Sequence, residues 1–445
     1  MPLPSSYVSL AARFAAGDTS PSNELKTRLA RLDAIEPEIH AFVHIRREAA
    51  LAAVEASDKR WHSGQQLSPI DGMPVGIKDI IETEDMPTGQ GSPLWTGFET
   101  KRDSASVFAL REAGAVILGK TKTTEFAASV PLMPAANPHD PKRTAGGSSA
   151  GSAAAVGGGI VPAAIGSQVV GSTLRPASFC GCVGYKPTYG ALNRGGSFDH
   201  LTQSCVGMLA ATPDDAWAVA MAIASRVGGD PGYPGLAGPS ALPAAIKPRR
   251  LAFLETAGWE KASEGAKVAM AEARKRLADL GIAVVGRRDD PAIEAFEQVI
   301  VEAGPVTFKI GDWEWRWPLG TYAKREGLSE PMRKRLASGL AMTTDDYRDA
   351  LKRREEIRAQ YAQLAAGFDG FVLLGATGAA PVGLSWTGDT TMNVPASLLG
   401  TPAITLPLLA DEGMPLGLQL IGRKDEDAAL MAIAEWLWQH YGSEH

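Results

Sequence analysis

Two serines and a lysine stand in surroundings that could make them reactive. A Gly- and Ser-rich run spans Gly146–Ser152, a second serine, Ser172, directly follows a glycine, and Lys78 lies in an apolar run upstream. A serine hydroxyl needs a base to become a nucleophile. A lysine can be that base only when it is neutral, and burial favours the neutral amine by lowering a pKa that is otherwise about 10.4. The alternative is that Lys78 reaches solvent or pairs with Asp79.

Spacing and context argue against other kinds of site. Gly114–Thr121 has the spacing of a phosphate-binding loop, but a helix is expected before it and the residues between its glycines are apolar, so it is expected to contain a buried strand. Cys180 and Cys182 are separated by a single residue, which is closer than the ligands of zinc sites. The seven histidines are scattered, and the sequence leaves a Ser-His-Asp triad open without indicating one.

An uncharged stretch over residues 144–174 contains both serines, although 21% of the chain is charged. A membrane-spanning helix would need about 20 predominantly apolar residues. Many glycines, Pro162 and several hydroxyl side chains interrupt the stretch, so it does not fit such a helix. Its small residues favour backbone that packs closely around a buried polar site, because glycine permits close approach.

The run over residues 146–188 resembles the Gly- and Ser-rich signature of the amidase signature family of serine hydrolases. Asp71–Asp79 is similar to the segment with the family's catalytic lysine, Gly114–Phe126 to the strand that follows it, and Gly413–Gly422 to its C-terminal strand. These matches span nearly the whole chain. The resemblance implies an amidase that cleaves amide C–N bonds through an acyl-enzyme, with no metal and no cofactor.

Carried over by position, the family's Ser-Ser-Lys triad falls on Ser172 as nucleophile, Ser148 as bridging serine and Lys78 as base. The resemblance also implies a cis peptide bond between Gly147 and Ser148. Neutral Lys78 would take the proton of Ser148, which would take that of Ser172 as Ser172 attacks the carbonyl. Backbone N–H groups would stabilise the oxyanion, and the expected donors are those of Val169, Val170, Gly171 and Ser172.

The sequence departs from the family's pattern around the nucleophile. Gln168 stands where many members have an aspartate, and Val170 stands where many have a glycine, which narrows the space for the acyl group. Arg175 follows Ser172 by three positions rather than two, a variant that some members share, and is expected to be structural. Ser204 replaces an aspartate that is often found after the signature.

Two variable segments, Ala127–Ala135 and Gly304–Met342, are expected to bind the substrate. Trp313, Trp315 and Trp317 in the second segment would share one face of an extended strand, either as ordinary core or as the wall of a pocket. A pocket wall of this kind favours an apolar or aromatic substrate, and aryl amides or carbamates such as urethanes fit the same chemistry. The candidate substrate-binding residues are Gly147, Gln168, Ser129, Met133 and Trp315.

The elements that must position these residues alternate between helix-like and strand-like patterns, which predicts an α/β fold. We expect a single large domain over residues 1–445 with a central mixed β-sheet covered by helices on both sides. Its core covers roughly residues 65–225 and 368–442, and residues 226–367 would determine the substrate. Within the latter, the Gly- and Pro-rich connector that starts at Val227 and ends at Pro248 is either a domain boundary or a surface loop.

Apolar periodicity gives the individual elements. The predicted helices are Glu24–Ile35, Arg46–Trp61, Ser104–Glu112, Asp214–Ala224, Ser263–Leu280, Asp345–Ala366 and Asp425–Tyr441. The predicted strands are Pro74–Ile81, Ala115–Leu118, Leu251–Leu254, Ala283–Val285, Phe371–Leu374, Ala403–Leu406 and Leu416–Ile421.

The composition narrows the partners and the compartment. A net charge of −6 without long basic runs argues against nucleic acid or an anionic membrane as a partner. Three cysteines do not form a disulfide framework, and the start of the chain lacks a secretory signal, so a cytoplasmic protein is expected. The expected partner is a small-molecule amide or carbamate, and a homodimer is the candidate assembly.

Two other classes of function are weighed. One is a glutaminase-type component of an amidotransferase complex, which the departure at Gln168 and the C-terminal helix disfavour. The other is a non-catalytic binding protein on the same scaffold, which the presence of all three triad positions disfavours.

Overall fold

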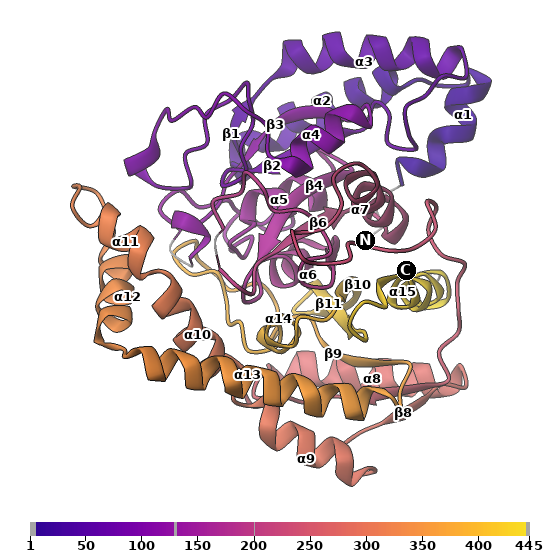
Figure 1. Ribbon diagram of the computed structural model, residues 1–445. Coiled ribbons are helices and arrows are strands. Elements are labelled where there is room, and N and C mark those ends of the chain that lie inside the picture. Colours follow the sequence, from indigo (N-terminus) through magenta and orange to yellow (C-terminus); the bar gives the residue numbers. More distant parts are fainter. Residues whose placement is uncertain (1–5, 129–130, 200, 442–445) are drawn as a thin grey trace.

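One β-sheet runs through the described part of the molecule, with helices on both of its faces (Figure 1). The computed structural model describes residues 6–128, 131–199 and 201–441. Within them the sheet has 11 strands, in the order β1 (Phe42–Ile45), β3 (Val116–Thr121), β2 (Pro74–Lys78), β4 (Ala163–Gln168), β6 (Cys205–Ala210), β5 (Val183–Lys186), β10 (Ala403–Asp411), β11 (Met414–Ile421), β9 (Gly370–Leu374), β7 (Arg250–Phe253) and β8 (Ala283–Val285). The expected α/β fold with a mixed sheet is confirmed.

The sheet is mixed because it contains both parallel and antiparallel pairs. β2 runs parallel to β3 and β4, and β7 runs parallel to β8 and β9. The pairs β4–β6, β5–β6, β5–β10, β10–β11 and β9–β11 are antiparallel. Parallel neighbours end at the same edge of a sheet, so the loops that follow β2 and β4 meet there.

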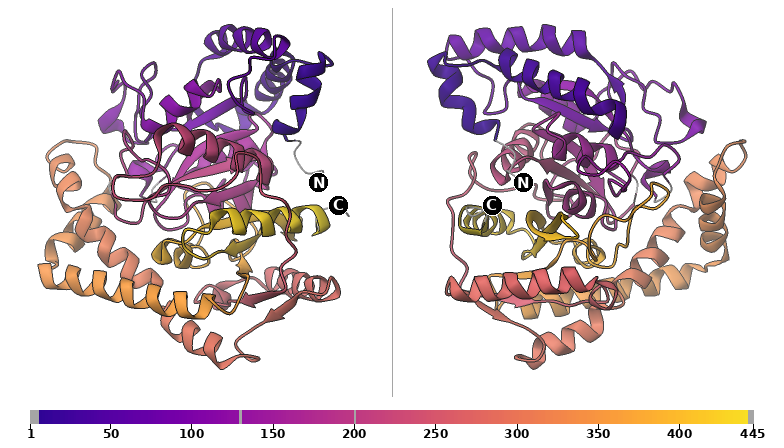
Figure 2. Two further views of the ribbon diagram at one scale, coloured as in Figure 1. Left: turned by 45° about the vertical axis from the view of Figure 1, so that its right-hand side comes forward. Right: turned by 180° about the vertical axis from the view of Figure 1, so that it is seen from behind.

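Helices cover the sheet along its whole length (Figures 1 and 2). They are α1 (Ala11–Ala16), α2 (Pro21–Ile39), α3 (Arg47–His62), α4 (Ala105–Glu112), α5 (Ala150–Gly157), α6 (Leu174–Cys180), α7 (Pro213–Val227), α8 (Glu264–Asp279), α9 (Pro291–Ile300), α10 (Ala303–Glu314), α11 (Arg316–Tyr322), α12 (Glu330–Ala341), α13 (Thr344–Ala365), α14 (Val394–Leu399) and α15 (Asp427–Tyr441). Each helix and strand predicted from apolar periodicity is present, with ends that differ by at most five residues, the largest difference being at the end of β10.

The two faces of the sheet bury different sets of side chains, as the period of two in a strand requires. In β4, Ala163 and Ile165 pack into the core under α4, α7, α8 and α15, whereas Ala164 packs into the core under α2, α3 and α5. A third core joins α9, α10, α13 and α14. All residues of β2 and β4 are buried, which explains why both strands are apolar with few polar exceptions.

Close helix packing explains the small residues of the uncharged stretch. A Cβ on Gly151 in α5 would overlap the carbonyl oxygen of Ala41 and the backbone nitrogen of Lys122. Gly151 therefore lets α5 lie directly against the backbone next to β1 and β3. None of the helices within the described residues combines the length and the apolar composition that a bilayer crossing requires.

The prediction of a strand over the three tryptophans is wrong. Trp313 is the penultimate residue of α10, Trp315 joins α10 to α11, and Trp317 lies in α11. Trp315 is buried, Trp313 stacks on Tyr347 with ring centroids 5.2 Å apart, and Trp317 is 73% exposed. Alternate spacing resembles a strand, but packing of α10 against α12, α13 and α14 makes this segment helical and sends the three rings to different surroundings.

The connector over residues 228–249 has no helix or strand and joins α7 to β7. β7 and β8 then extend the same sheet, next to β9. In Figure 1 the helices α8, α9 and α13 lie at the end of the molecule opposite α2 and α3, and α11 and α12 project at the left. Residues 226–367 therefore add one edge of the sheet, the helices α8, α9 and α13, and a helical arm that we define as α10, α11 and α12, residues 303–341.

Candidate active site

Lys78 is the last residue of β2 and is completely buried. Its Nζ donates hydrogen bonds to the Oγ atoms of Ser148, at 2.7 Å, and Ser167, at 2.8 Å. Burial lowers the pKa of Lys78 to about 7 because it removes the ammonium from water, and the negative charge of Asp199 acts in the opposite direction. Near neutral pH this amine is therefore available in its neutral form, which accepts a proton.

Asp79 does not pair with Lys78. It faces Lys120, and the distance from Lys120 Nζ to Asp79 Oδ1 is 3.2 Å, with both side chains buried. The N–H of Gly89 donates to the other carboxylate oxygen of Asp79 at 3.1 Å. The alternative interpretation of Lys78 as a salt-bridged or solvent-reaching lysine is therefore wrong.

Ser148 lies just before α5, and only 3% of it is exposed. The peptide bond between Gly147 and Ser148 is cis, as expected. The carbonyl of Gly147 accepts a hydrogen bond from Nη2 of Arg175 at 2.7 Å, and the same nitrogen donates to Thr387 at 3.1 Å. Arg175 is buried and holds this backbone, which agrees with its expected structural character.

Ser172 lies in the loop between β4 and α6 and is partly exposed. The N–H of Ser149 donates to the carbonyl of Ser172 at 3.2 Å, which ties the two serine segments together. The sheet edge at the end of β2 and β4 thus brings Lys78, Ser148 and the Ser172 loop to one place, although the two serines are 24 positions apart in the sequence.

The loop from Val169 to Ser172 presents unused backbone donors. No residue in the described ranges accepts a hydrogen bond from the N–H groups of Val169, Val170, Gly171 or Ser172. Donors without a protein partner beside a serine are suited to bind the oxygen of a carbonyl on which negative charge develops.

The candidate substrate-binding residues fall into different surroundings. Gln168 is fully buried, and its amide bonds to the backbone of Thr173 and to Ser397, which points to holding the loop. Met133 is exposed, and Ser129 lies outside the described residues. Gly147 lies in the site itself, where a Cβ would come within 2.7 Å of the Thr387 side chain.

Trp315 belongs to an aromatic cluster that we define as Trp95, Phe126, Trp315 and Tyr322. Ring centroids are 6.2 Å apart for Phe126–Trp315, 4.9 Å for Phe126–Tyr322 and 5.7 Å for Trp95–Tyr322. Val169 of the Ser172 loop packs against the larger hydrophobic cluster to which Phe126 and Trp315 belong. The cluster therefore lies next to the site, although its members come from three distant segments.

Sequence reasoning missed Ser167, Asp199 and Phe126 as neighbours of the site. Ser167 was one hydroxyl among many in the uncharged stretch, and Asp199 has no local pattern that marks it. Phe126 adopts a left-handed backbone with φ of 49°, and Ala127 follows with φ of 58°. Such backbone in residues with a side chain is uncommon and concentrates at functional sites, but no sequence pattern announces it.

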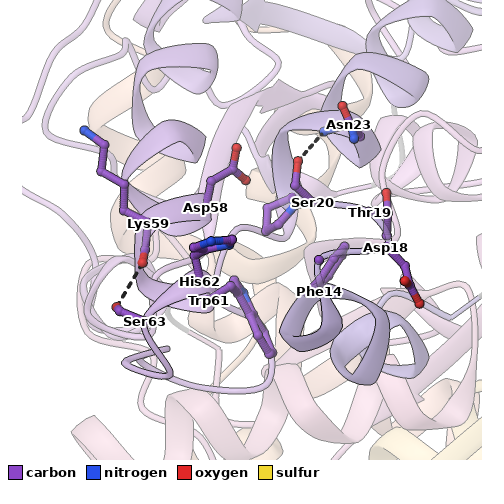
Figure 3. Close-up of a pocket in the computed structure, with 12 residues that line it drawn as sticks. Phe14, Asp18, Thr19, Ser20, Asn23, Asp58, Lys59, Trp61, His62 and Ser63 are labelled. Carbon is purple, nitrogen blue, oxygen red and sulfur yellow. Dashed lines mark hydrogen bonds between the residues drawn. The ribbon is translucent and has the colours of Figure 1, made fainter.

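A pocket away from these residues, shown in Figure 3, lies between α1 and the adjoining ends of α2 and α3. Its polar groups serve local structure: Ser20 Oγ accepts from the N–H of Asn23, and Ser63 Oγ donates to the carbonyl of Lys59. Lys78, Ser148 and Ser172 do not line this pocket. Among the described residues no group of three or more His, Cys, Asp or Glu side chains is arranged to hold a metal.

Comparison with known sequences gives a consistent result. The model of the amidase family matches residues 24–431. A glutamyl-tRNA(Gln) amidotransferase subunit from Chloroflexus aurantiacus (strain J-10-fl) is 33% identical, over 95% of this chain and 94% of that protein. The protein of the same name from Myxococcus xanthus is 30% identical, over 98% of this chain and 96% of that protein.

Comparison with solved structures extends this likeness to the whole chain. An amidase crystal structure superposes with a TM-score of 0.85 at 28% identity and covers 98% of this chain and 100% of the other. The structure of native peptide amidase from Stenotrophomonas maltophilia has a TM-score of 0.78 at 24% identity, over 99% of this chain and 98% of that one, and shows the likeness of fold.

Proposed function

The chain belongs to the amidase family, and on that premise we propose that it hydrolyses small amides through Ser172, Ser148 and Lys78. The observation that carries the proposal is the 2.7 Å hydrogen bond between Ser148 and a fully buried Lys78 whose pKa is about 7. A lysine without a carboxylate in contact, placed against a serine, has the properties of a general base.

The reaction proceeds in two halves. Neutral Lys78 takes the proton of Ser148 while Ser148 takes that of Ser172, and Ser172 Oγ forms a bond to the carbonyl carbon. The oxyanion is held by N–H groups of the Ser172 loop. When the C–N bond breaks, the proton returns through Ser148 to the leaving amine. Water then attacks the acyl ester, gives a proton to the same relay, and releases the acid and free Ser172.

The surroundings of the loop support an apolar or aromatic substrate. Val169 packs against the hydrophobic cluster that contains Phe126 and Trp315, and Val170 packs against the third core, to which α10 and α14 contribute. Both side chains are only partly buried, so they border the space beside Ser172. An anilide or an aryl carbamate presents the same carbonyl to the serine as a simple amide and adds a ring that this surface accommodates.

A second candidate function is release of ammonia from glutamine for a partner enzyme. The curated relatives named above favour it, since both are parts of an amidotransferase and the match covers nearly the full length of both chains. We place it second because a buried Gln168 stands where many family members have an aspartate. A purified chain that hydrolyses glutamine alone among amides would put this candidate first.

The proposal also assigns a role to each part of the chain and a cellular compartment to the enzyme. The two core segments, 65–225 and 368–442, supply the chemistry, and residues 226–367 select the substrate through Trp315 and its neighbours. The three cysteines are buried and unpaired, which suits a reducing compartment, and we place the enzyme in the cytoplasm, acting on a small molecule as a homodimer or alone.

The test is a panel of aliphatic amides, anilides, aryl carbamates and glutamine, assayed by amine or ammonia release. We expect turnover of at least one anilide or carbamate, and complete loss of that turnover in Ser172→Ala. Turnover that persists in Ser172→Ala, or no turnover of any member of the panel, would contradict the proposal.

A further inference from the structure

The loop that carries Ser172 is held from α14 by one buried hydroxyl. Ser397 Oγ donates to the carbonyl of Val170 at 2.9 Å and accepts from Nε2 of Gln168 at 3.0 Å. Gln168 is 0% exposed and Ser397 is 1% exposed. These contacts cross about half the chain, so α14 and the end of β4 meet only in the folded protein.

Peptide planarity converts these contacts into fixed directions for backbone donors. In a planar trans peptide the carbonyl of Val170 and the N–H of Gly171 point in opposite directions, so the hydrogen bond from Ser397 sets the N–H of Gly171. In the same way the carbonyl of Gly171 accepts a hydrogen bond from the N–H of Arg175 at 3.0 Å, which fixes the direction of the N–H of Ser172. The N–H of Gly171 therefore points away from Ser397, and the N–H of Ser172 points away from the N–H of Arg175.

Gln168 closes the loop at both ends. Its Oε1 accepts hydrogen bonds from the N–H groups of Thr173, at 2.9 Å, and Leu174, at 3.0 Å, while its Nε2 donates to Ser397. The four loop residues between Gln168 and Thr173 are therefore spanned by a single side chain. An ionised aspartate or glutamate at this position would have acceptors only and no proton to give to Ser397.

α14 is itself anchored to the sheet. Nδ2 of Asn393, just before α14, donates to the carbonyl of Gly375 at 2.8 Å and to Oε1 of Gln419 in β11 at 2.7 Å. A Cβ on Gly171 would lie 2.9 Å from Cβ of Asn393, so the loop also packs against this residue. The anchor of the loop is thus tied directly to the strands of the sheet.

We propose that Ser397 and Gln168 are positioning residues, which aim the N–H groups of Gly171 and Ser172 at the oxyanion before the substrate binds. This inference rests on the proposed amide hydrolysis at Ser172. Neither residue takes part in the proton relay, so each acts on transition-state stabilisation alone.

Ser397→Ala tests the proposal, because it leaves the carbonyl of Val170 and Nε2 of Gln168 without their shared partner. Loss of one oxyanion donor costs about 10²- to 10³-fold in kcat, so a misdirected donor is expected to lower kcat about 10-fold or more. KM should stay within about 2-fold and the pH at which kcat is half-maximal should not move, since Lys78 is untouched. Gln168→Glu, which keeps the size but when ionised cannot donate to Ser397, should lower kcat in the same way. Its added negative charge beside Ser167, a partner of Lys78, should move the half-maximal pH upward, as Asp199 does.

The matched control is Ser57→Ala in α3. It removes an equally buried hydroxyl, which donates to Asp71 at 2.8 Å. It should lower Tm and leave kcat unchanged. A second readout is the rate at which a fluorophosphonate labels Ser172, which needs no known substrate and should fall in parallel with kcat. Full kcat and full labelling rate in folded Ser397→Ala and Gln168→Glu would overturn the positioning role. An unreactive wild-type Ser172 would instead overturn the proposed function.

Discussion

At the scale of single residues, Lys78 is the proposed base, and burial lowers its pKa to about 7. The hydrogen-bond partners of its Nζ are the hydroxyls of Ser148 and Ser167, which cannot stabilise an ammonium as a carboxylate would. Asp199 is the charge that acts against the effect of burial. If Lys78 is the base, the balance between burial and the charge of Asp199 sets the pH range of activity.

Activity should rise with pH through about 7, because the neutral form of Lys78 is the active one. Asp199→Asn removes a charge that raises the pKa of Lys78, so the rise should move to lower pH. The measurement is kcat against pH for both proteins on one amide. If the profile of Asp199→Asn stays in place or moves to higher pH, the rise of activity with pH cannot be assigned to Lys78.

Lys78 should also lower the stability of the folded protein. The pKa of Lys78 is lower in the folded state than in the unfolded chain, so the buried lysine lowers the free energy of unfolding. This loss of stability is full below about pH 7 and disappears as the pH approaches 10.5, the pKa in the unfolded chain. Lys78→Met should therefore be inactive yet more stable than wild type, by up to a few kcal/mol at about pH 7 and by less at about pH 10. Urea denaturation at the two pH values measures this. Equal or lower stability of Lys78→Met at the lower pH would count against a buried, neutralised lysine.

At the scale of elements, α5 sets Ser148 by lying against the backbone beside β1 and β3. Gly151 makes this approach possible, because a side chain there would overlap Ala41 and Lys122. Likewise, the end of β4, closed by Gln168 and held from α14, sets the loop of Ser172. Helix packing and loop anchoring thus place two serines from separate elements beside one strand end.

Gly151→Ala should destabilise the protein by about 1–3 kcal/mol, the usual cost of forcing a methyl group into a packed interior. It should also lower activity, since α5 must shift away from its contact. Gly320→Ala is the control: it lies in α11 with no atom within 4 Å of the added methyl, and should be neutral or slightly stabilising. Denaturant midpoints of the two variants give the comparison, and a fully stable Gly151→Ala would refute the close contact.

At the scale of the whole molecule, segments far apart in the chain meet around Ser172. The aromatic cluster joins Trp95 and Phe126 to Trp315 and Tyr322 of the helical arm, and Val169 packs against the larger hydrophobic cluster around it. Glu125, completely buried, accepts a hydrogen bond from Ser329 near the start of α12. The arm formed by residues 303–341 is thereby fixed against the core that holds Lys78, Ser148 and Ser172.

Trp315→Leu should change selectivity more than chemistry. It removes a ring from the cluster beside Val169, so kcat/KM for an anilide should fall about 10-fold relative to that for an aliphatic amide, as expected for one apolar contact. Trp317→Leu, on the same arm but 73% exposed, is the control and should leave the ratio unchanged. An unchanged ratio in folded Trp315→Leu would remove this residue from substrate selection.

Local pattern and family likeness together predicted much of this arrangement. The strands around Lys78 and the C-terminal hairpin could be predicted because they are continuous apolar runs bounded by turn residues. The three tryptophans were misassigned because alternate spacing also occurs in helices, where packing rather than period decides the fold. Ser397 and Asp199 could not be found, because their interactions with Gln168 and Lys78 join positions far apart and leave no local trace.

The most direct measurement of the central claim is the site and rate of acylation. A slowly hydrolysed aryl carbamate should leave its carbamoyl group on Ser172, which peptide mass mapping locates. The rate of formation should rise with pH through about 7 and fall about 10²- to 10⁴-fold in Lys78→Met, the usual range for loss of a general base. A carbamoyl group on another residue, or an unchanged rate in folded Lys78→Met, would contradict the account.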